Sequence, residues 1–154
     1  MFNIKIITIS KSSDRNILES INNYSKKMSS QFNISSINIK PEKKYDSIDK
    51  KKKIEAEKIA SHISGSFVVA LDEKGKLYDS KEFAYKISWW KQNFSCLTFI
   101  IGGADGLDNS MLDKADAILS FSKMTFPHQL IKLFLYEQLY RSSAILTNHP
   151  YHRE

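Results

Sequence analysis

The sequence predicts an α/β protein of three layers, in which helices cover both faces of a mostly parallel sheet. Short apolar segments alternate along the chain with segments of helical periodicity, as they do in proteins with parallel strands. Two of the apolar segments, residues 66–72 and 96–101, are continuous, which is typical of strands buried on both faces. With 154 residues, of which 42% are hydrophobic, the chain has the size of one domain, expected to span residues 1–154.

The first expected elements are a strand, a helix and a second strand. Residues 2–9 are rich in β-branched side chains, which favour strands. From Asp14 onward apolar residues recur on one helical face, and either Ser12 or Ser13 is available as the N-cap of that helix. Residues 32–39 are mostly alternating and predict the second strand.

The segment from residue 40 to residue 58 is rich in lysine, and two interpretations of it stay open. Its first half is expected to be a solvated loop, and its second half to enter a helix that ends near Ile63, before Gly65. The lysines could form a basic patch that faces RNA, or they could be the solvated face of a loop and a helix, which the pattern favours.

Strands and helices continue to alternate in the second half of the chain. Five elements are expected there in the order strand, helix, strand, helix, strand, over residues 66–72, 80–93, 96–101, 111–115 and 117–122. Residues 72–76 are expected to turn the chain after the first of these strands. Pro127 is expected at the first position of a final helix that ends near Ser143.

The final helix carries more apolar surface than one core-facing side requires. Its apolar residues, which cover more than half of its circumference, are Leu130, Ile131, Leu133, Phe134, Leu135, Leu139 and Tyr140. Two explanations stay open: the helix is buried in its own core, or the additional face packs against a second subunit. Glu137 and Arg141, four residues apart on the polar side, are expected to form an ordinary surface ion pair.

Charge and cysteine content constrain the partners and the compartment. The formal net charge of +6 and a pI near 9.3 make a polyanionic partner plausible. The single cysteine, Cys96, cannot form an internal disulfide and is expected to be a small buried hydrophobic residue, which favours the cytoplasm. No apolar run is long enough for a membrane-spanning helix. His149 and His152 lack a third ligand at motif spacing, so no metal is expected.

Three loops directly follow predicted strands, and each offers groups that a ligand could use. They are LDEKG at residues 71–75, GGADGL at residues 102–107 and SKMTFP at residues 122–127. Because ligands of open α/β sheets bind at the carboxyl ends of the strands, the loops could converge on one crevice. GGADGL matches no nucleotide-phosphate motif, and a tight turn into a helix capped by Asp108 or Ser110 is the alternative explanation for it.

Four segments together resemble one family closely. FIIGGADGL, LSFSKMTFPHQL, LYEQLYRSSAI and NHPYHRE are similar, in this order, to segments of the small bacterial SPOUT methyltransferases that act on N3 of a pseudouridine in 23S ribosomal RNA. The similarity covers the whole chain in length and in element order. One departure is Lys132 in the final helix, where the family pattern would have arginine; this weakens any bidentate contact of that position with phosphate.

The resemblance implies S-adenosylmethionine as cofactor, bound in a C-terminal trefoil knot, and a homodimer. By position, the implied cofactor-binding residues are Leu71, Gly103, Ser122, Lys123, Met124, Thr125, Phe126 and Pro127. Backbone groups of these loops would hydrogen-bond the adenine and the ribose, while Leu71 and Met124 would supply apolar walls.

The resemblance also implies that the C-terminal tail reaches the cofactor pocket of the partner. Tyr151, His152 and Arg153 are then candidates for holding the target base, and Arg141 for a phosphate. A histidine could accept the proton of N3, or an arginine could stabilise the developing anion, and both alternatives stay open. With no separate RNA-binding domain, the dimer and the assembled ribosome would supply recognition. The alternative function is a non-catalytic protein that binds ribosomal RNA with the same fold.

Overall fold

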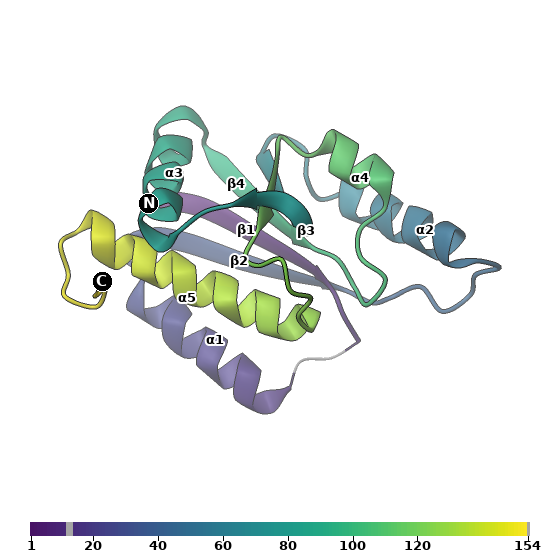
Figure 1. The fold of residues 1–154 in the computed structure, drawn as a ribbon, viewed down its shortest axis with the longest axis horizontal. Helices are drawn as coiled ribbons and strands as arrows, with labels where there is room; N and C mark the ends of the chain where they lie inside the picture. Colours follow the sequence, from purple (N-terminus) through teal and green to yellow (C-terminus); the bar gives the residue numbers. More distant parts are fainter. Residues whose placement is uncertain (12–13, 154) are drawn as a thin grey trace.

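In the computed structural model, which describes residues 1–11 and 14–153, five strands alternate with five helices (Figure 1). In chain order the elements are β1 (Phe2–Ile9), α1 (Arg15–Lys27), β2 (Phe32–Ile39), α2 (Ile48–Ala60), β3 (Phe67–Leu77), α3 (Ser80–Asn93), β4 (Cys96–Ile101), α4 (Asn109–Lys114), β5 (Ala117–Ser120) and α5 (His128–Leu146). This order confirms the predicted alternation of strands and helices.

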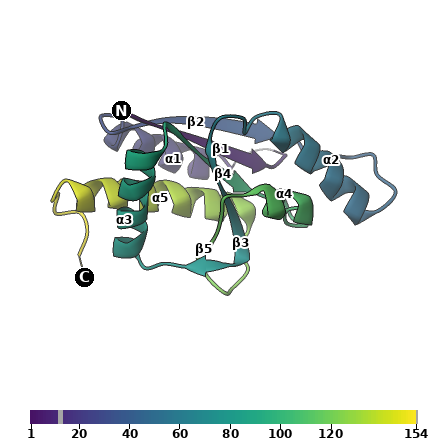
Figure 2. The same cartoon turned by 90° about the horizontal axis from the view of Figure 1, so that it is seen from above.

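The five strands form one sheet in the order β2-β1-β4-β3-β5, and every paired strand runs parallel to its neighbour. The predicted parallel sheet is therefore confirmed. The strands β4, β3 and β5 are direct neighbours, so their carboxyl ends lie at the same edge of the sheet. In the views of Figures 1 and 2, α2 and the C-terminus lie toward opposite ends of the molecule.

Two hydrophobic clusters lie on the two faces of the sheet. The larger one joins α1, α3 and α5 to one face, with Ile21, Trp90 and Leu135 among its buried residues. The other joins α2 and α4 to the opposite face through Ile59 and Met111. Neighbouring residues of β4 belong to different clusters, which is why its apolar run is continuous.

Several boundaries differ from the predictions. The N-cap of α1 is Asp14, whose side chain accepts hydrogen bonds from the backbone N–H groups of Asn16 and Ile17; the predicted caps Ser12 and Ser13 lie outside the described residues. The helix α2 ends at Ala60, before the expected Ile63. Pro127 is the N-cap of α5 rather than its first helical residue, and α5 continues past Ser143 to Leu146.

The clearest difference concerns residues 72–76, which do not leave the sheet as a turn. They stay within β3, whose pairing with β5 is interrupted by a bulge, so that Leu71 and Lys76 both pair with Leu119. Gly75 passes so close to β5 that an added Cβ would lie 2.6 Å from the backbone of Leu119. Only glycine fits at this approach, and the bulge places the residues after Leu71 at the edge of the sheet.

No helix within the described residues combines the length and apolar character that a membrane-spanning helix needs. Cys96 is half-buried at the start of β4 rather than fully buried, and it forms no disulfide.

Candidate functional site

The three predicted loops converge on one cavity at the carboxyl ends of β3, β4 and β5. The cavity has a volume of about 790 Å³. Its walls come from residues 71–74 of β3, from the glycine-rich loop 101–107, from residues 119–122 and 124–127 after β5, and from the first turn of α5. The expectation that these loops meet in one crevice is therefore confirmed. We refer to this cavity as the loop pocket.

Hydrogen bonds hold the loops in place. The hydroxyl of Thr125 donates to Glu73 Oε2 over 2.8 Å and so joins the loop after β5 to the bulge of β3. The buried Ser120 shapes the same loop, because its Oγ donates to the carbonyl of Ser122 and accepts from the N–H of that residue. The Oγ of Ser122 in turn accepts from the N–H of Met124 over 2.9 Å.

The glycine-rich loop is a tight turn that also lines the pocket, so both explanations of this segment apply. Gly103 and Gly106 form an isolated antiparallel bridge, with 3.0 Å between the N of Gly106 and the O of Gly103. An added Cβ on Gly102 would lie 2.8 Å from the backbone of Gly106, which leaves no room for a side chain. Gly106 has a φ of +78°, a region that favours glycine. Of the two expected helix caps, Asp108 is the one used.

Most of the proposed cofactor residues lie at the loop pocket. The lining includes Leu71, Gly103, Ser122, Met124, Thr125, Phe126 and Pro127. Lys123 is exposed and does not line the pocket, although its two neighbours in the loop, Ser122 and Met124, do. The side chain of Met124 is 72% exposed and therefore lies at the mouth rather than in the wall.

Several lining residues were missed as individual candidates. Asp72, Glu73 and Asp105 bring carboxylates to the pocket, and their positions in loops after strands could have indicated them. His128, the first residue of α5, also lines the pocket, and burial lowers the pKa of its imidazole. Lys52 reaches the pocket from α2, and no local pattern in the sequence indicates that contact.

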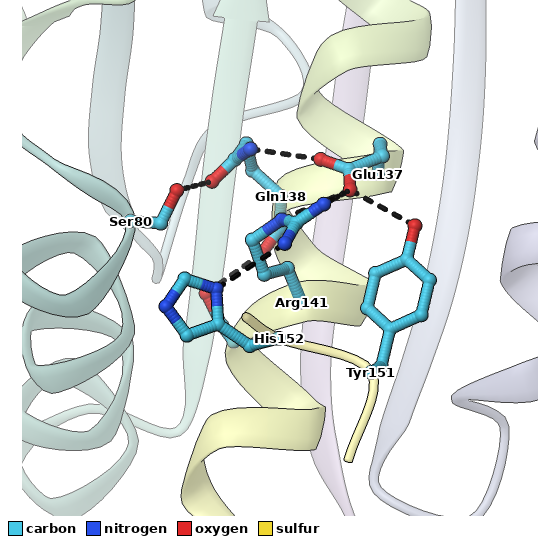
Figure 3. Close-up of polar contacts among 7 residues, drawn as sticks. Ser80, Glu137, Gln138, Arg141, Tyr151 and His152 are labelled. Carbon is cyan, nitrogen blue, oxygen red and sulfur yellow. Dashed lines mark hydrogen bonds and ion pairs between the residues drawn. The ribbon is translucent and has the colours of Figure 1, made fainter. Parts of the chain in front are cut away.

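A second group of polar side chains lies on α5 and on the tail that follows it (Figure 3). Arg141 donates from Nε and Nη2 to Glu137 Oε1 over 3.0 and 2.6 Å, and the Tyr151 hydroxyl donates to the same oxygen over 3.0 Å. Arg141 Nη1 lies 3.2 Å from His152 Nδ1. Because a guanidinium can only donate, this His152 nitrogen is the acceptor. We call these four residues, Glu137, Arg141, Tyr151 and His152, the tail cluster.

Two further hydrogen bonds connect the tail cluster to Gln138 and Ser80. Gln138 Nε2 donates to Glu137 Oε2 over 2.8 Å, and the Ser80 hydroxyl donates to Gln138 Oε1 over 2.8 Å. The network thus connects the start of α3 to the tail through one carboxylate (Figure 3). The predicted ion pair of Glu137 and Arg141 is confirmed, but Glu137 holds the tail as well.

The electrostatics of the tail cluster keep its phenol and its guanidinium protonated. Burial raises the pKa of Tyr151, and hydrogen bonding with Tyr24 and with the Glu137 carboxylate raises it further. The hydrogen bonds that Arg141 donates to Glu137 also raise the pKa of Arg141. Tyr151 therefore stays a neutral phenol near neutral pH, and its one O–H is already donated to Glu137.

Within one chain the tail cluster and the loop pocket are separate. Arg141, Tyr151 and His152 do not line the loop pocket, and Arg153 is exposed. Glu137 and Gln138 line a neighbouring cavity of about 570 Å³. That cavity and the loop pocket share residues 119–122. The structure thus brings three of the four candidate tail residues together, but not with the cofactor residues of the same chain.

Most of the broad apolar surface of α5 is buried within the core of the same chain. Leu135 and Leu139 are fully buried against the sheet and the neighbouring helices. Phe134 is 37% exposed and makes an edge contact with Phe126 at the pocket. Lys132, the departure from the family pattern, is only 8% exposed, and burial lowers the pKa of its amine. Within the described residues no group of three or more His, Cys, Asp or Glu side chains could hold a metal ion.

Taken together, the fold and the pocket define an α/β protein with a cavity at the carboxyl ends of three neighbouring parallel strands, the place where open α/β sheets bind ligands. The chain belongs to the SPOUT methyltransferase family, because the family model described as "Predicted SPOUT methyltransferase" matches residues 2–152.

Relatives of nearly equal length support this assignment. The chain is 44% identical over 152 residues to the ribosomal RNA large subunit methyltransferase H of Acholeplasma laidlawii, with 97% of this chain and 99% of the relative covered. It is 40% identical to the protein of that name from Acetivibrio thermocellus, with 97% and 99% covered, and 36% identical to that from Neisseria meningitidis serogroup A, with 99% of each covered.

A solved structure shows the same fold. A probable methylase family protein from Haemophilus influenzae Rd KW20 superposes with a TM-score of 0.58 at 14% identity, covering 99% of this chain and 71% of that one.

Proposed function

We propose that this protein transfers the methyl group of S-adenosylmethionine to N3 of a pseudouridine in the 23S ribosomal RNA of the large subunit, on assembled ribosomes. The observation that carries the proposal is the loop pocket, formed by the loops that the family resemblance assigns to the cofactor. The family membership and the shared name of the full-length relatives support the substrate class.

The residues of the loop pocket fit S-adenosylmethionine. The volume of about 790 Å³ lies within the roughly 300 to 1,000 Å³ of small-molecule sites. Leu71, Leu107 and Phe126 offer apolar walls for a flat base. Carboxylates at the pocket, among them that of Asp72, suit a ligand that carries a sulfonium, an ammonium and ribose hydroxyls. We infer that Leu71, Gly103 and the loop from Ser122 to Pro127 hold the cofactor.

Bound S-adenosylmethionine would supply an electrophilic methyl group, and the chain has two tasks. It must hold the target nitrogen in line with the methyl carbon, and it must remove or neutralise the proton of N3. Tyr151 stays protonated and donates its one O–H to Glu137, so it is a candidate for holding the base through its ring and through its oxygen as a hydrogen-bond acceptor. His152 is the candidate proton acceptor, a role that requires its Nδ1 to be released from Arg141 when the base binds. Arg153 is the candidate for stabilising the developing anion, and Arg141 is the candidate phosphate contact.

The separation of the tail cluster from the loop pocket favours a site shared between two chains. We infer a homodimer in which the tail of one chain serves the pocket of the other. Exposed apolar side chains beside the pocket, Phe134 and Met124, are available to such an interface. We also infer one domain over residues 1–154 with a trefoil knot, as the family implies. The close approach of Gly75 to the backbone of β5 supports tight chain packing there. A ribosomal substrate would place the protein in the cytoplasm.

Labelled methyl transfer tests the proposal. Ribosomes from a strain that lacks this protein are incubated with purified protein and labelled S-adenosylmethionine, and the modified nucleotide is located by mass spectrometry. Incorporation at N3 of a pseudouridine in 23S ribosomal RNA is expected. A protein that binds ribosomes but neither binds the cofactor in calorimetry nor labels them would instead be the non-catalytic RNA-binding alternative.

A further inference from the structure

A row of four lysines occupies the first two turns of α2, next to the loop pocket. Lys50, Lys51, Lys52 and Lys53 follow the N-cap Ser47 closely. The N-terminus of a helix carries the positive end of the backbone dipole, so lysines are electrostatically unfavourable there. Helix stability therefore does not account for this arrangement, and a partner of negative charge would.

Contacts of α2 fix this row at the edge of the loop pocket. Lys51 Nζ forms an ion pair with Asp105 Oδ2 of the glycine-rich loop over 2.7 Å, and this hydrogen bond raises the pKa of Lys51. Lys52 lines the pocket itself. Lys52 and Lys53 are close enough to Asp108, the cap of α4, for their charges to contribute to its lowered pKa, beyond the main effect of the hydrogen bond from Ser110.

Of the eight lysines in residues 40–58, three form an ion pair with a carboxylate. Lys50 is paired with Asp46, Lys58 with Glu42 and Lys51 with Asp105. By contrast, Lys52 and Lys53 form no ion pair with a carboxylate of the described chain at salt-bridge distance. Asp108 lies within electrostatic range of both lysines, but neither is held in an ion pair, and Lys53 is exposed to solvent while Lys52 is half-buried at the pocket.

An exposed aromatic ring lies against Lys51 of the same row. Tyr45 is 45% exposed, and Lys51 Nζ lies 5.4 Å from the centre of its ring. Lysines beside an exposed aromatic ring are the combination that binds single-stranded nucleic acid, because the lysines contact phosphates and the ring stacks on a base. We call Tyr45, Lys52 and Lys53 the α2 surface.

We propose that the α2 surface binds the backbone of the RNA strand next to the target nucleotide, with Lys52 and Lys53 at phosphates, and so delivers that nucleotide to the loop pocket. This inference rests on the proposed function, since it takes RNA as the substrate. It gives the lysine-rich segment a role that the sequence alone did not favour. Lysine contacts with phosphate carry no sequence information, so the surface supplies affinity and orientation rather than recognition of the base.

The test reverses the two charges. Lys52→Glu/Lys53→Glu is compared with Lys26→Glu/Lys91→Glu, which changes the net charge equally at exposed lysines in the last turns of α1 and α3. For the first variant we expect the KM for ribosomes to rise about tenfold or more. The salt dependence of ribosome binding should weaken by about two units of slope. Lys53→Glu alone, at an exposed lysine that does not line the loop pocket, should raise the KM for ribosomes in part, with little change in kcat or in the Kd for S-adenosylmethionine. The control should behave as wild type.

Further variants separate charge from folding and from stacking. Lys52→Gln/Lys53→Gln removes the charges without adding new ones and should give an intermediate KM, while Tyr45→Ala should weaken ribosome binding without changing the salt slope. Equal KM values for the α2 variant and the control would overturn the inference. An increase in the Kd for S-adenosylmethionine that accounts for the whole loss would also overturn it, because the lysines would then serve the pocket.

Ribosome cosedimentation at increasing salt distinguishes this inference from the proposed function. If wild-type protein labels no ribosome, the proposed function fails. The cosedimentation comparison still decides on the α2 surface, because it requires no turnover.

Discussion

Replacing Glu137 is the most informative perturbation, because one carboxylate organises the whole tail cluster. Glu137 Oε1 accepts two hydrogen bonds from Arg141 and one from Tyr151. Glu137→Ala removes all three, whereas Glu137→Gln keeps an acceptor of similar shape without the charge. We expect Arg141 and Tyr151 to lose their fixed positions in the first variant and to keep them in part in the second.

The structure sets the size of the effect on stability. The side chains of Arg141 and Glu137 are 24% and 19% exposed, so the pair lies between a surface ion pair, worth up to about 1 kcal/mol, and a buried pair, whose breakage costs about 3 to 5 kcal/mol. We expect Glu137→Ala to lower the free energy of unfolding by about 2 kcal/mol, which for a chain of this length lowers Tm by about 4 to 8 °C. Glu137→Gln should cost about half of that.

In Glu137→Ala, methylation activity should fall by more than the loss of stability accounts for. If the tail cluster positions the residues that hold the base, its loss should lower kcat by about 100-fold, since small misplacements of reacting groups have effects of that order. Ribosome methylation, S-adenosylmethionine calorimetry and thermal unfolding are measured on both Glu137 variants and on Glu19→Gln, an exposed control on α1. We expect unchanged cofactor affinity and partial recovery of kcat in Glu137→Gln.

A clear result would refute this reasoning. Wild-type kcat in Glu137→Ala, measured at a temperature at which that variant is folded, would show that the cluster only stabilises the tail. A loss of cofactor affinity equal to the loss of activity would show that Glu137 acts on the pocket.

Three further predictions concern the loop, the buried lysine and the exposed helix face. Gly102→Ala should lower both Tm and S-adenosylmethionine affinity, because the new Cβ would lie 2.8 Å from the backbone of Gly106. Gly103→Ala should have a milder effect, because its Cβ would lie 3.2 Å from the Cγ2 of Ile9, a side-chain atom. Equal losses in the two variants would contradict this explanation. Lys132→Met should raise Tm at neutral pH. Burial lowers the pKa of Lys132, so the unfolded chain binds the proton of this amine more tightly than the folded chain does. The stability of the wild-type protein therefore rises with pH up to the ordinary lysine pKa of about 10.4. The gain in Tm of Lys132→Met over wild type should shrink between pH 7 and 10, and a constant gain would refute the explanation. Phe134→Glu should sediment as a monomer where wild-type protein is a dimer at micromolar concentration, and a wild-type monomer would contradict the dimer.

The resemblance of four segments predicted the family, which the comparisons confirm, and proposed a set of cofactor residues. The structure adds how these residues meet. The bottom-up pattern had marked the same three loops, since each follows a strand. It could not assign a cofactor, because glycine-rich loops after strands serve many ligands. Seven of the eight transferred positions line the loop pocket, and Lys123 does not.

The sequence by itself determined the elements and their order. The bounds of α3 and β4 were predicted as they are found, because a capping residue and a change of periodicity are local signals. The continuous apolar runs of β3 and β4 likewise identified strands covered on both faces, since the burial of each residue follows from the period of its own element.

Only the tertiary structure decided contacts between distant segments. The sequence predicted a turn at residues 72–76, yet β3 continues past them, because β5 pairs with Leu71 before the bulge and with Lys76 and Leu77 after it. The ion pair of Glu137 and Arg141 followed from helical spacing, but the bond from Tyr151 required the tail to fold back on α5. The sequence favoured solvated lysines on α2, but Lys51 contacts Asp105, which lies 54 residues further along the chain. Such contacts depend on how whole elements pack, which no local pattern of residues encodes.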